Sequence, residues 1–155
     1  MSVENNLEKL GIVLPAAAAP VANYVPFVRT GALLVVSGQL PLESGALPAR
    51  FTGRVGADVS PDMGKEAAKV AAIACIAQAK AALGDLAKIR RVVRLGGFIA
   101  PEAGFTALPA IMDGASDLMV AAFGDKGRHA RTTVGVAELP RGACIEVEAM
   151  FEVEP

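Results

Sequence analysis

The chain has 155 residues, 53% of them hydrophobic, with a formal net charge of −1 and a mean hydropathy of +0.45. This length fits one domain with its own core, so we expect a single domain over residues 1–155. Proteins that bind nucleic acids usually carry an excess of basic residues. The near-zero net charge of this chain shows no such excess, which argues against a nucleic-acid partner. The apolar content is high for a lone domain and predicts a homo-oligomer whose subunits bury part of it.

The N-terminal region, residues 1–26, is predicted to be mainly an extended segment lying on the protein. A short helix is expected over residues 2–11, with Ser2 as its cap and Gly11 at its end. Residues 10–28 carry no charge and approach the length of a membrane-spanning helix. Three prolines interrupt this run, and the chain shows no basic N-terminal region of a signal peptide. We therefore expect no membrane partner and a cytoplasmic protein. The prolines are Pro15, Pro20 and Pro26.

A strand, a loop and a long helix are predicted next. Residues 33–37 form a short apolar run typical of a buried strand, and residues 43–58 form a Gly/Pro-marked loop. A helix over residues 61–83 has Ser60 as its cap and Gly84 as its C-terminal stop. Its predicted apolar face consists of Val70, Ile73, Ala74, Ala77 and Ala81.

The C-terminal half contains a predicted strand over residues 89–100, a helix region over residues 101–123, and two last strands over residues 132–137 and 144–153. The last strand alternates apolar and polar residues, so one face packs on the helices. This order of elements predicts an α+β fold, a mixed sheet with two main helices packed on one face. The apolar positions of the last strand are Ile145, Val147, Ala149, Phe151 and Val153.

Cysteine and histidine usage is sparse. Cys75 and Cys144 are far apart, and His129 is the single histidine, so no metal-binding or redox spacing is present. We expect two buried, reduced thiols, no metal site and no cofactor. His129, beside Arg128, is expected to be a surface-loop residue.

Two residues at the starts of the last two strands are candidates for chemistry. Arg131 precedes an uncharged strand, and its planar guanidinium can hold both oxygens of a small carboxylate. Glu146 opens the alternating strand and can orient a water molecule or move a proton. Two plainer interpretations stand beside these. In the first, Arg131 pairs with Glu148 or Glu152 at the edge of a strand; in the second, Glu146 is one of several solvated glutamates.

The stretch from Arg131 to Ala149 resembles the Rid family of reactive intermediate deaminases, also called the YjgF or endoribonuclease L-PSP family. That family carries an arginine, Ser or Thr, valines, Leu-Pro, and a Glu-x-Glu-Ala ending. Tyr24 lies thirteen residues before a Ser-Gly-Gln-x-Pro stretch that begins at Ser37, a spacing that the family shares. The run over residues 88–100 fits the family's central strand, so the resemblance covers most of residues 20–153.

The resemblance implies a chorismate-mutase-like fold, homotrimers with a cleft at each subunit boundary, and hydrolysis of 2-imino or 2-enamino acids to 2-keto acids and ammonia. By resemblance, Arg131 would hold the substrate carboxylate, and Glu146 would position the attacking water. We expect the Arg131 guanidinium to have no ion pair with an acid of its own chain. The backbone of Thr133 would bind the substrate nitrogen or carboxylate. The alternatives are a non-catalytic module that binds small carboxylates and, less favoured, an endoribonuclease. By resemblance, the cleft would be lined from the partner side by Tyr24, Ser37 and Gly38.

Two features of the sequence complicate this interpretation. If the last two strands formed a hairpin, Glu146 would face Val136, which is about 17 Å from Arg131. Either the strands are not hairpin neighbours, or Glu146 serves a cleft built with another chain. In addition, Asp113 stands where the family often has an asparagine, and an inward-pointing carboxylate there would repel an anionic substrate. The chain therefore resembles a divergent subgroup.

Overall fold

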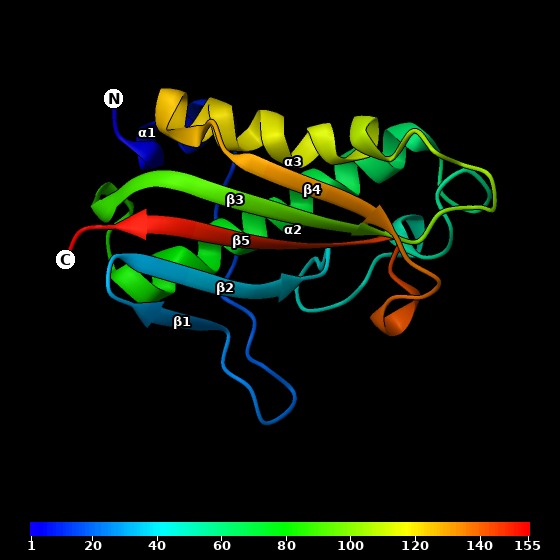
Figure 1. Cartoon of the computed structure of the whole chain (residues 1–155), viewed down its shortest axis with the longest axis horizontal. Helices are drawn as coiled ribbons and strands as arrows, with labels where there is room; N and C mark the ends of the chain where they lie inside the picture. Colours follow the sequence, from blue (N-terminus) through cyan, green and yellow to red (C-terminus); the bar gives the residue numbers. More distant parts are fainter.

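The computed structural model describes all 155 residues as two layers, a five-stranded sheet and the helices on one of its faces (Figure 1). The predicted α+β architecture, with two long helices against a mixed sheet, is confirmed. The helices are α1 (Val3–Lys9), α2 (Pro61–Leu83) and α3 (Leu108–Phe123). The strands are β1 (Phe27–Thr30), β2 (Leu33–Gln39), β3 (Ile89–Ile99), β4 (Ala130–Gly135) and β5 (Ile145–Val153).

The sheet has the strand order β1-β2-β5-β3-β4. Strand β4 runs parallel to β3, and every other neighbouring pair is antiparallel. Leu95 of β3 pairs with Arg131 of β4 on one side and with Ala149 of β5 on the other. The last two strands are therefore not hairpin neighbours, because β3 separates them.

Helix α2 begins and ends where the sequence predicts. The Ser60 hydroxyl accepts a hydrogen bond from the Met63 backbone N–H, and Gly84 takes the left-handed conformation with φ 75°. The predicted apolar face is partly wrong. Ala81 is exposed, and the centre of the buried face follows Ala67, Ala71 and Cys75 instead. In an alanine-rich helix the side chains on most faces are similar in size and hydropathy. The sequence alone therefore gives little basis for choosing which face is buried.

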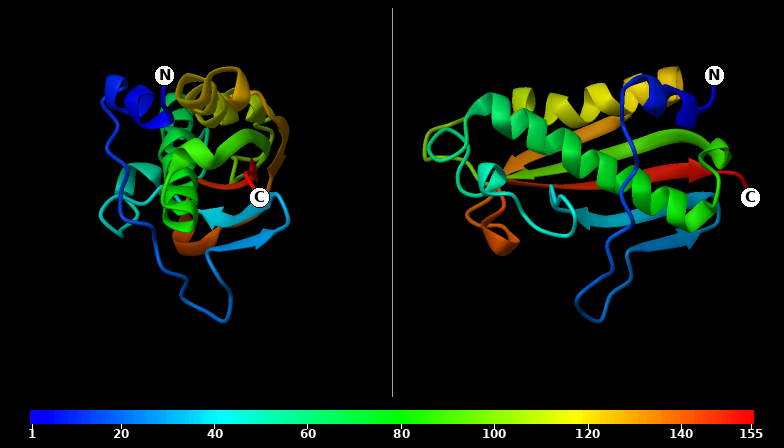
Figure 2. Two further views of the ribbon diagram at one scale, coloured as in Figure 1. Left: turned by 90° about the vertical axis from the view of Figure 1, so that its left-hand side faces the viewer. Right: turned by 180° about the vertical axis from the view of Figure 1, so that it is seen from behind.

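Strand β5 confirms the predicted alternation. Its apolar residues are buried beneath the helices, and Glu146, Glu148, Met150 and Glu152 lie partly exposed on the other face. Figure 2 shows that the helices cover one face of the sheet and leave this open face uncovered. Three valines on the open face remain accessible to solvent, which leaves apolar surface for a second chain to cover. They are Val28 (52% exposed), Val35 (37%) and Val134 (39%).

The N-terminal segment begins with α1, capped by the Ser2 hydroxyl as predicted. Residues 12–26 then form neither helix nor strand and cross over α2 (Figure 2, right). The buried Gln78 of α2 fastens them there, since its Nε2 donates to the Ala18 carbonyl at 2.7 Å. Strand β1, which directly follows, was not predicted. No helix of the chain is long and apolar enough to cross a lipid bilayer.

Smaller differences concern the boundaries of the elements. Helix α3 occupies only the second part of the predicted helix region, and β4 begins two residues earlier than expected. The predicted loop over residues 43–58 contains one 3-10 turn, Ala49–Phe51. Both cysteines are buried and free, as expected.

Candidate functional site

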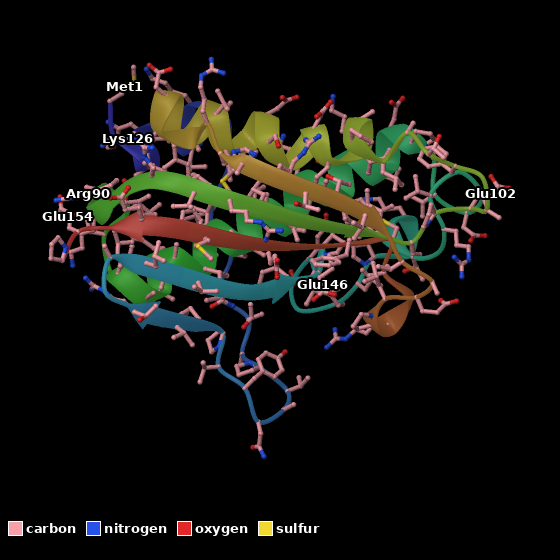
Figure 3. All side chains as sticks on the ribbon, in the orientation of Figure 1. Met1, Arg90, Glu102, Lys126, Glu146 and Glu154 are labelled. Carbon is pink, nitrogen blue, oxygen red and sulfur yellow. The ribbon has the colours of Figure 1, made fainter.

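Four of the six predicted site residues line one cavity of about 200 Å³. It lies between the N-terminal segment, the end of β2 and the start of β5, and Figure 3 shows Glu146 beside the end of β2. The structure thus brings together residues that are more than a hundred positions apart in sequence. These residues are Tyr24, Ser37, Gly38 and Glu146.

Glu146 reaches the cavity across the open face, and its side chain covers Gly38. A Cβ atom on Gly38 would lie 2.9 Å from the carboxyl carbon of Glu146, so only glycine leaves room for this carboxylate. Glu146 forms no ion pair or side-chain hydrogen bond within the chain. Burial, followed by the nearby charge of Glu148, raises its pKa. A half-buried carboxyl group with a raised pKa is well suited to accept and return a proton.

The part of the N-terminal segment that contains Tyr24 and lines the cavity is attached to β2 by two hydrogen bonds. The Ser37 hydroxyl donates to the Val25 carbonyl at 2.7 Å, and the Ser37 backbone N–H donates to the Pro26 carbonyl at 2.9 Å. The Ser37 hydroxyl therefore orients this segment and retains only its acceptor capacity for a ligand. Tyr24 itself is 52% exposed and marks the outer rim.

Arg131 is held by α3, away from this cavity. Its Nη1 donates to Asp113 Oδ1 at 2.9 Å and to Ser116 Oγ at 3.1 Å. Its Nη2 donates to the Pro109 carbonyl at 3.3 Å. The expectation that Arg131 is free of acids from its own chain is therefore wrong, because Asp113 compensates its charge. A guanidinium has five N–H groups, so two remain without an acceptor within the chain.

The alternative ion pairs considered from the sequence are wrong as well. Glu148 pairs with Arg94 at 3.1 Å, and Glu152 pairs with Arg91 at 3.6 Å, all on the open face. Arg131 points to the opposite, helix-covered side, where neither glutamate can reach it.

His129 takes part in the same network, which corrects its assignment as a simple surface-loop residue. Its Nδ1 lies 2.6 Å from the Gly127 carbonyl, which can only accept, so Nδ1 carries a proton. Its Nε2 lies 2.9 Å from Ser116 Oγ. In the neutral imidazole, Nε2 accepts the Ser116 hydroxyl hydrogen, and this leaves the serine oxygen oriented to accept from Arg131.

Thr133 lies two residues beyond Arg131 on β4 and therefore on the same face of the sheet. Its hydroxyl oxygen is buried without a hydrogen-bond partner. Across the sheet, Thr133 aligns with Gly97, and Gly97 aligns with Val147, which is buried under the helices. Glu146, the residue before Val147, consequently points to the opposite face. One chain therefore cannot present Arg131 and Glu146 to the same small ligand.

Sequence reasoning missed one charged residue of the cavity. Arg141, in the 3-10 turn Pro140–Gly142 just before β5, lines it together with Glu146. The available signal was a Pro-Arg-Gly turn immediately before the strand that Glu146 opens. No group of three or more His, Cys, Asp or Glu side chains gathers closely enough to hold a metal ion.

A comparison with models of protein families identifies the family to which the chain belongs. The model described as "YjgF/chorismate mutase-like, putative endoribonuclease" matches residues 4–151. The chain belongs to the YjgF family. The YjgF fold accounts for the mixed sheet with its helices on one face, and the predicted resemblance is confirmed.

Known relatives of this YjgF protein span nearly its whole length. Protein TCP17 of Trypanosoma cruzi is 47% identical over 152 residues, which cover 97% of this chain and 94% of TCP17. The crystal structure of Atu1372 from Agrobacterium tumefaciens, a protein of unknown function, is 47% identical with a TM-score of 0.91 and coverages of 98% and 92%. RidA from the Antarctic bacterium Psychrobacter sp. PAMC 21119 is 26% identical with a TM-score of 0.61 and coverages of 89% and 94%.

Proposed function

We propose that this YjgF protein hydrolyses 2-imino and 2-enamino acids to 2-keto acids and ammonia, at a site built from two copies of the chain. The observation that carries the proposal is the position of Glu146, a half-buried carboxyl group with a raised pKa in a cavity with Tyr24, Ser37 and Gly38. These are the residues that the resemblance to the Rid family assigns to the cleft.

The chemistry requires little from the protein. An enamine first takes up a proton at carbon and becomes the imine, whose carbon is already electrophilic. Ionised Glu146 removes a proton from water as the water oxygen bonds to the imine carbon, and then returns that proton to the nitrogen. Glu146 then carries the proton of the new hydroxyl group to the same nitrogen, the C–N bond breaks, and ammonia leaves as the carbonyl forms. The raised pKa supports both halves of this proton transfer near neutral pH.

The second copy is needed because Arg131 and Thr133 lie on the helix side of edge strand β4, whereas Glu146 lies on the open face. We propose that the cavity of one subunit faces β4 of its neighbour in a homotrimer, as the resemblance implies. The exposed valines of the open face support an assembly that covers this face.

Asp113 modifies how a substrate would bind. Its carboxylate compensates Arg131 and leaves two guanidinium N–H groups for the substrate carboxylate. Because the pair is partly exposed, its internal attraction is weakened by solvent, and a second anion can still bind the free edge of the guanidinium. We expect weaker carboxylate binding than an uncompensated arginine would give.

The printed family description includes endoribonuclease activity, which the charges of this chain do not favour. On the open face, Arg91 and Arg94 are each paired with a glutamate, so they offer little net positive charge to RNA. The two free, buried thiols support a reducing compartment, and we propose the cytoplasm.

The test is ammonia release from enzymatically generated 2-aminoacrylate, measured above the rate in buffer. The wild-type protein should accelerate it, and Glu146→Gln should abolish the acceleration while keeping the oligomer intact. Arg131→Lys, which keeps the charge but loses the planar fork, should raise KM. A wild-type protein without acceleration would contradict the proposal. Thermal stabilisation by 2-keto acids without turnover would instead indicate a carboxylate-binding module.

A further inference from the structure

A second arginine, Arg141, lines the same cavity as Glu146 but differs from Arg131 in its electrostatic environment. Arg131 is compensated by Asp113, whereas Arg141 forms no ion pair with any acid of the chain. Its one hydrogen bond within the chain is to the Gly45 carbonyl, at a long 3.4 Å. Arg141 thus lines the cavity, and its guanidinium has no acid partner within the chain, so its charge is free to bind an anion.

The backbone at Arg141 is unusual for a residue with a side chain. Its φ of 60° and ψ of 10° place it in the left-handed region, which is unfavourable for an L-residue other than asparagine or aspartate. Gly142, with φ 74°, directly follows. Such strained positions are concentrated at binding and catalytic sites. The turn therefore directs an arginine, where glycine or asparagine would be easier to accommodate, to the rim of the cavity.

The cavity keeps the cation and the glutamate apart. No ion pair joins Arg141 to Glu146, although both residues line the same cavity of about 200 Å³. A ligand can therefore approach Glu146 with its reacting carbon and Arg141 with an acidic group, without first breaking an ion pair. Apolar lining residues such as Leu40 and Leu42 suit the carbon chain between these two groups.

We propose that Arg141 binds an acidic group on the substrate's side chain, so that the preferred substrates are 2-imino acids with a second carboxylate. This inference rests on the proposed function, in which the first carboxylate binds Arg131 of the neighbouring copy. One arginine is sufficient to anchor the first carboxylate, and the unpaired Arg141 provides a separate position for the second.

The test compares two imines generated in place by amino-acid oxidases, the dicarboxylic 2-iminoglutarate and the monocarboxylic 2-iminobutyrate. The wild-type protein should favour the dicarboxylic imine in kcat/KM by about tenfold. Arg141→Gln should remove this preference through a higher KM for the dicarboxylic imine, with the monocarboxylic imine unchanged. Arg141→Lys should retain part of the preference. Equal losses for both imines, or no loss, would overturn the inference.

Two controls keep the result interpretable. Arg90→Gln removes one exposed positive charge at the other end of the sheet (Figure 3) and should change neither rate. Arg141→Asn, tolerated in the left-handed region, should lose the preference while keeping the wild-type melting temperature. If it keeps the preference, the inference fails.

A binding measurement separates this inference from the proposed function. By calorimetry, 2-oxoglutarate should bind the wild-type protein about tenfold more tightly than 2-oxobutyrate, and Arg141→Gln should abolish the difference. If no imine is hydrolysed, the deaminase proposal fails, but a preference lost in this variant still supports Arg141 as an anion-binding residue. No preference in the wild-type protein would overturn it.

Discussion

Arg131 and Glu146 lie on opposite faces of one sheet, with strand β3 between the two strands that carry them. Arg131 points under α3, where it contacts Asp113, and Glu146 points to the open face, where it covers Gly38. Any small ligand that touches both side chains must therefore sit between two copies of the chain.

Asp113→Asn should tighten the binding of small keto acids. The amide keeps the shape of the carboxylate but removes the charge that compensates Arg131, so an incoming carboxylate meets less repulsion. For a partly exposed pair we expect about threefold tighter binding of 2-oxobutyrate by calorimetry. Asp117→Asn, one turn further along α3 and paired with Lys65, is the matched control and should have no effect. Unchanged or weaker binding in Asp113→Asn would count against Arg131 as the carboxylate site.

Glu146→Gln should stabilise the fold at neutral pH. Burial raises the pKa of Glu146 in the folded protein above its value in the unfolded chain. At neutral pH the ionised carboxylate is therefore less favourable in the folded state than in the unfolded state, and this lowers the free energy of unfolding. Below the usual glutamate pKa of about 4.3 the group is protonated in both states, and the difference should vanish. The measurement is the melting temperature of both proteins across pH at one protein concentration. A lower melting temperature for the variant at pH 7 would show that Glu146 has a structural role.

Gly38→Ala should abolish the proposed imine hydrolysis without unfolding the protein. The new Cβ would occupy the space of the Glu146 carboxyl group and push it out of the cavity. Loss of a positioned general base predicts a fall in kcat of about a hundredfold. Gly96→Ala is the comparison, because its Cβ would displace Glu148 on the same face, outside the cavity; it should change the pH dependence of hydrolysis through the Glu148 charge and leave Glu146 in place. Full activity in Gly38→Ala would show that Glu146 does not act from the position it has in this structure.

The sequence contained most of the local structure. Helix α2 could be predicted because Ser60 caps it and Gly84 ends it, and β5 because its residues alternate. Strand β1 has only four residues, three of them exposed, and directly follows Pro26, so no alternation could reveal it. The pairing of β5 with β2 and β3 depends on contacts far apart in sequence, which local patterns do not encode.

The candidate site could be predicted only in part. The resemblance assigned Tyr24, Ser37, Gly38 and Glu146 to a cleft, and these four residues line one cavity of the chain; their roles in binding and catalysis stay predictions. The contact between Arg131 and α3 depends on which face of β4 the side chain occupies, and that follows from the strand order. Arg141 belongs to no such pattern, and only the turn geometry brings it to the cavity.

In the proposed assembly each site takes Arg131 from one subunit and Glu146 from another. The most direct test mixes two inactive variants, Arg131→Ala and Glu146→Gln, by joint unfolding and refolding, and measures imine hydrolysis. Random assembly should restore about a quarter of the wild-type activity, because a quarter of the interfaces then combine an intact Arg131 with an intact Glu146. A mixture that stays as inactive as its two components, despite forming mixed oligomers, would contradict the shared site.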